Sequence, residues 1–115
     1  DDVARLLATL RRTAEGESDV AGWARHIAIP LVEGFTSFAR GEYAAAAETL
    51  HPVRFHANAF GGSHAQRDII DWTMTEAAIR AGLKDLARSY ANERIALKAH
   101  SPINRDFLRR ASALG

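Results

Sequence analysis

The residues best suited to chemistry lie together in residues 61–68, where two glycines and a serine precede His64, Arg67 and Asp68. His64 and Asp68 are four positions apart, so they share one face of a helix, as a His–Asp general base would require. Free amides at a helix N-terminus, beside His64 and Arg67, would attract a phosphate or carboxylate. An enzyme acting on a small anionic substrate is therefore one function that these residues leave open.

The same stretch also has a structural interpretation, which we prefer. Gly61 and Gly62 permit a sharp turn, and Ser63 suits the position just before a helix. Gln66 follows three positions later, which completes a capping box in which each side chain bonds the other residue's amide. The Lys-Ser/Thr ending of a phosphate-binding P-loop is absent. We therefore expect a hinge that opens a central helix.

Arg67 and Asp68 then fall on a helix that we expect to be buried on several sides. A buried charge is costly without a partner. Arg67 is therefore expected to pair with Asp71 or Glu93, and Asp68 to accept hydrogen bonds from a neighbouring helix or loop.

No metal or cofactor site is predicted. The chain has no cysteine, and the spacings of His51, His56 and His64 match no zinc motif. The composition also gives no general attraction to nucleic acid or to a membrane, because 15 basic and 14 acidic residues leave a net charge of +1. We interpret the basic C-terminal residues as a solvated helix face; they are Arg88, Lys98, Arg105, Arg109 and Arg110.

At 115 residues and 47% apolar content, the chain is expected to form a single domain, residues 1–115. It has no signal peptide pattern and no stretch long enough to span a bilayer, so we expect a cytoplasmic protein. It begins inside an amphipathic helix without an initiator Met, which suggests a processed product or a piece of a longer protein.

Helical periodicity runs through the whole chain, and no strand is predicted. We expect helices at residues 2–14, 20–40, 43–57 and 84–98, a central helix that opens after Ser63 and carries the apolar run of residues 69–81, and a terminal helix from Pro102 capped by Ser101. Pro30 and Pro52 should kink or divide two of these helices. Gly41 and Gly82 should close turns.

Apolar residues at helical spacing support each of these helices. Those of the later helices are Ala46, Ala47, Leu50, Val53, Phe55, Ile70, Met74, Ala77, Ala78, Ala81, Leu86, Ala87, Tyr90, Ala91, Ile95, Leu97, Ile103, Phe107, Leu108 and Ala111. Ile69, Trp72 and Ile79 add apolar residues on neighbouring faces of the central helix, which predicts burial on several sides. Small residues at Gly34, Ala46 and Ala87 should let paired helices approach closely.

Two stretches are alike. Gly34, Gly41, Tyr43, Ala46 and Leu50 match the tetratricopeptide consensus, and the step of five residues from Gly41 to Ala46 recurs from Gly82 to Ala87. The two glycines are 41 residues apart, longer than the consensus period of about 34. The prediction is an all-α fold of antiparallel helical hairpins stacked as a short tetratricopeptide-like α-solenoid.

Residues 61–68, the run Glu93-Arg94-x-Ala96-Leu97-Lys98 and Ser101-Pro102 resemble the tetratricopeptide repeat protein 38-like family. The resemblance covers residues 29–111, close to the C-terminal portion of such proteins. It implies an α-helical repeat fold with further repeats before this segment. It implies no reaction and no catalytic residues.

The preferred function is a scaffold that binds a peptide or protein partner, because stacked hairpins offer a concave surface. The polar residues expected to line it are Glu33, Thr36, Ser37, Arg40, Thr75, Glu76 and Arg80. A homo-oligomerisation module is a further alternative, with self-association expected through the N-terminal side.

Overall fold

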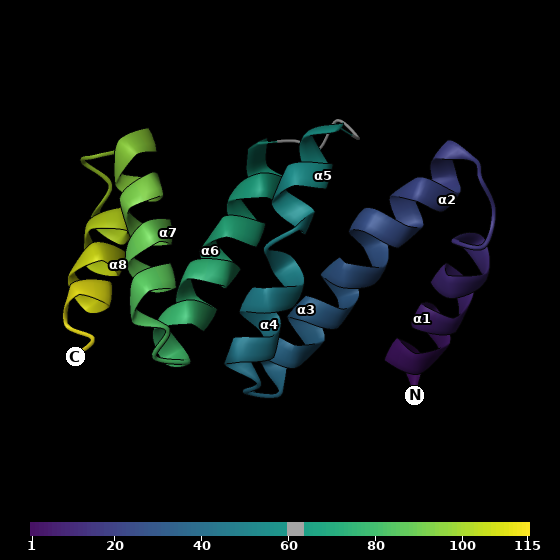
Figure 1. Ribbon diagram of the computed structural model, residues 1–115, viewed down its shortest axis with the longest axis horizontal. Coiled ribbons are helices and arrows are strands. Elements are labelled where there is room, and N and C mark those ends of the chain that lie inside the picture. Colours follow the sequence, from purple (N-terminus) through teal and green to yellow (C-terminus); the bar gives the residue numbers. More distant parts are fainter. Residues whose placement is uncertain (60–63) are drawn as a thin grey trace.

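The computed structural model describes residues 1–59 and 64–115, apart from the side chains of residues 58, 59 and 64, and every regular element in these ranges is helical. The elements are α1 (Asp2–Thr13), α2 (Asp19–Trp23), the π-helix η1 (Ala24–Ala28), α3 (Ile29–Ala39), α4 (Tyr43–Leu50), α5 (Val53–Ala59), α6 (His64–Arg80), α7 (Lys84–Leu97) and α8 (Pro102–Ser112) (Figure 1). The all-α class is confirmed.

Consecutive helices pack against one another in antiparallel pairs. α3 packs on α4, α6 on α7, and α7 on α8, while α4 also packs on α6. As a result, α3, α6 and α8 run in one direction and α4 and α7 run in the other (Figure 1). α6 contacts both α3 and α8, and is therefore the helix that connects the two halves of the chain.

Pro30 is the second residue of α3 and is preceded by a change of helix type. Proline has no amide to donate and clashes with the turn before it. The chain accommodates it through η1, where the amide of Ile29 donates to the carbonyl of Ala24, five residues back. Pro30 thus lies in the first turn of α3, and the chain stays helical from Asp19 to Ala39 with a π-helical segment before the proline.

Pro52 ends one helix early, as expected, with α4 finishing at Leu50 and α5 beginning at Val53. Leu50 and Val53 are fully buried. The expectation that Phe55 is also inside is wrong, because its side chain is 60% exposed. Leu50, Val53 and Ala57 are spaced by three and four residues and so share one buried helical face, whereas Phe55 lies on the opposite face.

Gly41 and Gly82 close the two hairpins with the same geometry. Their φ angles are +78° and +71°, in the left-handed region that favours glycine. Each glycine donates its amide to the carbonyl three residues back at 3.0 Å, and the next residue donates to the carbonyl five residues back at 2.9 Å. This is the Schellman motif at both sites, and it confirms both predicted turns.

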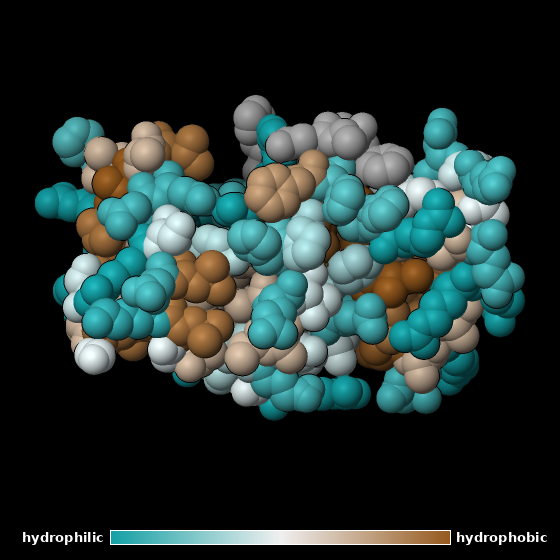
Figure 2. All heavy atoms as spheres, viewed as in Figure 1, coloured by the Kyte–Doolittle hydropathy of each residue, from teal (hydrophilic) through white to brown (hydrophobic). Residues whose placement is uncertain are grey.

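The core is formed largely by alanines and a few larger side chains. Ala46, Ala87 and Leu50 have no exposed surface. On the face turned to the viewer in Figure 2, further apolar side chains gather near α7 and between α1 and α3. The tight contacts confirm that small residues let these helices approach.

Several large apolar residues lie outside this core. Leu97, at the last turn of α7, and Ile103, in the first turn of α8, are largely exposed, although both belong to the apolar pattern of their helices. Ile69 and Trp72 are also exposed. Burial of α6 on several sides therefore holds only for residues 73–79, where α4, α7 and α8 surround it.

Ala46→Leu and Ala87→Leu are each expected to lower the free energy of unfolding by about 1–3 kcal/mol, because neither helix contact has room for a larger side chain. Chemical denaturation measures the effect. The exposed positions Ala45 and Ala96 provide matched Leu controls, which should change little. Equal denaturation midpoints for test and control variants would contradict the observed helix packing.

Candidate functional site

The predicted anion site at residues 61–68 is only partly described. Gly61, Gly62 and Ser63 lie outside the described residues, as does the side chain of His64. From His64, the first residue described after this gap, the chain is helical. The capping box with Gln66 and the binding of an anion remain predictions.

Asp68 has the partner from a neighbouring helix that the sequence predicts. Its carboxylate lies 3.2 Å from Nη2 of Arg94 on α7. Arg94 is buried, and its Nε donates to Oδ1 of Asn104 on α8 at 2.8 Å. The carboxylate of Glu93 accepts a bond from Arg54 at 2.7 Å. Asp68 therefore forms an ion pair between α6 and α7. The pairing of the half-buried Arg67 with Asp71 or Glu93 remains a prediction.

A small cleft lies beside these pairs and contains Asp71. Arg54, Tyr90 and Arg94 also line it. Burial raises the pKa of Asp71, against the opposing effect of the two guanidiniums, and burial likewise raises the pKa of Tyr90. The cleft has room for about one water molecule, which is too little for a substrate.

Asp71→Asn is expected to leave the melting temperature unchanged or to raise it at neutral pH. The folded-state pKa of Asp71 lies above its ordinary value of 3.8, so the ionised carboxylate lowers the stability of the fold at neutral pH. This loss of stability disappears as the pH falls through the folded-state pKa. Thermal unfolding at pH 7 and pH 4 should show any gain of the variant mainly at pH 7. A large loss of stability at pH 7 would show that the ionised group is needed.

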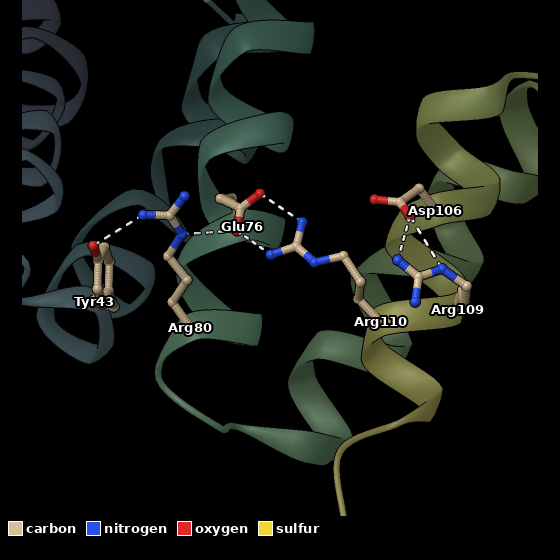
Figure 3. Close-up of polar contacts among 6 residues, drawn as sticks. All are labelled: Tyr43, Glu76, Arg80, Asp106, Arg109 and Arg110. Atoms are coloured by element: carbon tan, nitrogen blue, oxygen red, sulfur yellow. Dashed lines mark hydrogen bonds and ion pairs between the residues drawn. The ribbon is translucent and has the colours of Figure 1, made fainter.

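A second cluster of charges lies on α6 and α8 and centres on Glu76 (Figure 3). Only 4% of Glu76 is exposed. Its two oxygens accept bonds from Nη1 and Nη2 of Arg110 at 2.8 and 2.5 Å, and one also accepts from Nε of Arg80 at 2.9 Å. Nη1 of Arg80 donates in turn to the hydroxyl of Tyr43 at 3.0 Å. The cluster therefore connects α4, α6 and α8.

These bonds determine the ionisation of the cluster. The bonds from Arg110 hold the pKa of Glu76 below its ordinary value despite the opposing effect of burial, and the bond from Arg80 adds to them. The bond to Glu76 likewise raises the pKa of Arg110, and the bonds to Tyr43 and Glu76 raise that of Arg80. Glu76 is thus a fixed negative charge and both arginines remain positive.

An aromatic contact lies next to this cluster. Trp72, one helical turn before Glu76, meets Phe38 of α3 and Phe107 of α8 edge to face, with ring centroids 6.4 and 5.9 Å apart. Trp72 is 37% exposed. Ile69 lies one turn before Trp72 on α6, Ile103 lies one turn before Phe107 on α8, and both isoleucines are more than half exposed. We call this surface the α6 face; its residues are Phe38, Ile69, Trp72, Glu76, Arg80, Ile103, Phe107 and Arg110.

The polar residues predicted to line a concave surface have different positions. Glu76 and Arg80 are joined on the α6 face, but Glu76 and Thr75 are buried, so the expectation that these two line an open surface is wrong. The Thr75 hydroxyl instead donates to the carbonyl of Asp71 at 2.7 Å. The positive charge of Arg110 offsets the free-energy cost of burying the carboxylate of Glu76.

On α3 the predicted residues do not join that cluster. Glu33 lies 3.6 Å from Arg11 of α1, in an exposed ion pair. Ser37 and Thr36 are half-buried, and Arg40 is exposed at the end of the helix. The sequence reasoning also missed Trp72 as a site residue, although its spacing of four from Glu76 places both on one helical face.

Within the described part of the chain, no group of three His, Asp or Glu side chains is arranged to hold a metal ion. His26 of η1 and His56 of α5 stack with ring centroids 4.5 Å apart. This pair offers two possible nitrogen ligands, fewer than the three or more that a protein metal site uses. In the same ranges, no helix combines the length and the apolar character needed to cross a bilayer.

Comparison with known proteins yields no assignment. No family model matches the chain, and no solved structure shows a significant match.

Proposed function

We propose that this chain is a short tetratricopeptide-like α-solenoid, related to the tetratricopeptide repeat protein 38-like family, that binds a peptide or protein partner on the α6 face. The observation that carries the proposal is the exposure of Trp72, Ile69 and Ile103 beside a network of two arginines. Apolar anchors next to a small number of oriented polar groups are typical of recognition surfaces.

Three features support stacked repeats. The hairpins at Gly41 and Gly82 have the same hydrogen bonds and similar φ angles. The next helix starts two residues after each glycine, and a fully buried alanine follows each at a distance of five. Helix α4 of the first hairpin packs on α6 of the second, which is the neighbour contact by which repeats bury their faces.

The arrangement of helices supports binding on the α6 face. Helices α3, α6 and α8 run in the same direction, and the aromatic contact of Trp72 joins all three. An apolar strip and a charged cluster thus lie in line along α6, since Ile69, Trp72, Glu76 and Arg80 are spaced by three or four residues. A partner segment lying along α6 would contact both.

The test is selection of short peptides from a random display library on the immobilised protein. We expect selected peptides that bind the wild-type chain and lose binding to Trp72→Ala. Trp23→Ala is the matched control, because Trp23 is exposed to a similar degree and lies on α2. Failure to recover any peptide that depends on Trp72 would contradict the proposal.

A homo-oligomer is the second candidate, and one observation favours it. No residue of α1 is buried. Leu6 of α1 is 47% exposed, and Val20 of α2 is 60% exposed. We expect sedimentation to show concentration-dependent dimers that Leu6→Glu weakens. A strictly monomeric wild-type chain at high concentration would exclude this candidate.

A further inference from the structure

We infer that the partner segment presents a carboxylate to Arg80 and Arg110, two or three residues away from an apolar side chain that packs on Trp72. This inference rests on the proposed function and specifies the chemistry of the partner.

The first argument is the balance of charge at the lower end of the α6 face. Two guanidiniums, those of Arg80 and Arg110, meet one carboxylate, that of Glu76 (Figure 3). Asp106 is a further acid on α8, and its Oδ1 accepts two bonds from Arg109 at 2.6 and 3.1 Å. In the described part of the chain no other carboxylate forms an ion pair with Arg80 or Arg110, so one positive charge is left over.

The second argument is the number of donors that remain available. Arg80 uses Nε and Nη1 in its bonds to Glu76 and Tyr43, and its side chain is 47% exposed. Arg110 uses one hydrogen on each Nη and is 30% exposed. A guanidinium has five N–H donors in a planar fork that matches a carboxylate. Both arginines can therefore hold Glu76 and still bind a second carboxylate from solvent.

The third argument is the position of Trp72. Trp72 lies four positions before Glu76, whose carboxylate binds both guanidiniums, and this offset is about 6 Å along the helix axis at 1.5 Å per residue. An extended peptide covers that distance in about two residues, at roughly 3.3 Å each. Ile69 and Ile103 extend the apolar strip beyond Trp72, away from the arginines. The order along the partner is thus an apolar residue, a short spacer and an acid.

The test applies to the peptides recovered with wild-type protein in the display selection. We expect Asp, Glu or a free C-terminal carboxylate two or three positions from an aliphatic or aromatic residue. Synthetic versions with Glu replaced by Gln, or with an amidated C-terminus, should bind about tenfold more weakly, the loss of one charge-assisted bond. Arg80→Gln should weaken the acidic peptide about equally and the neutral version little.

Arg80 is the residue to change because Arg110→Gln would leave the buried Glu76 without its main partner and endanger folding. Arg109→Gln is the control, since it removes the same charge from an exposed position of α8. Peptides that depend on Trp72 but lack an acid, or that bind Arg80→Gln as well as wild type, would overturn this inference and leave the proposed function standing. Absence of any Trp72-dependent peptide would overturn both.

Discussion

Arg110→Ala is expected to lower the free energy of unfolding by about 3 kcal/mol, because it leaves the buried carboxylate of Glu76 without its bidentate partner. Arg80 alone would remain, through a single bond at 2.9 Å. Urea denaturation measures the loss. Arg109→Ala is the control on the same helix, and its exposed pair with Asp106 is expected to contribute less than about 1 kcal/mol.

The pH dependence provides a separate check on this network. The folded-state pKa of Glu76 lies below its ordinary value of 4.5, so its stabilising contribution is complete above that pH and is lost as pH falls through the folded-state pKa. The wild-type chain should therefore lose stability below about pH 4.5, and Arg110→Ala should lose less. Equal acid sensitivity in both proteins would contradict the role of Arg110.

Gly34→Ala is expected to destabilise the fold by about 2–3 kcal/mol, although alanine is the better helix former. A Cβ at position 34 would lie 2.5 Å from both Cγ and Cδ2 of Leu50. Leu50 has no exposed surface and cannot move aside, so α3 and α4 would have to separate. Chemical denaturation measures the loss.

A double-mutant cycle tests the cause of that loss. Leu50→Ala alone should cost about 2–5 kcal/mol through the cavity it leaves. If the clash is the cause, adding Gly34→Ala to Leu50→Ala should cost little or restore stability, because the new methyl group enters that cavity. Additive losses would show that Leu50 does not set the distance between α3 and α4.

Local signals in the sequence predicted the helices and turns well. Gly41 and Gly82 have the left-handed φ angles that their positions require, and Ser101 accepts the amide bond of Asn104 as a helix cap. Burial was less predictable. Phe55 was expected inside because it is apolar, yet the spacing of Leu50, Val53 and Ala57 already places it on the opposite side of the helix, where it is exposed.

The candidate site was partly readable from the sequence. The spacing of four between Glu76 and Arg80 places them on one helical face, where they form an ion pair. Arg110 and Tyr43 are 34 and 37 positions from their partners in the network, so only the packing of α4, α6 and α8 brings them together. A buried Glu76 therefore could not be inferred from its own segment.

The most direct test of partner binding on the α6 face is a two-dimensional ¹H–¹⁵N NMR titration of the labelled protein with one selected acidic peptide. The account predicts that the largest shift changes fall on Ile69, Trp72, Arg80 and Ile103, including the indole N–H of Trp72. The exposed residues of α4 and α7 should change little. Largest changes on α1 and α2, or on α7 alone, would contradict the account.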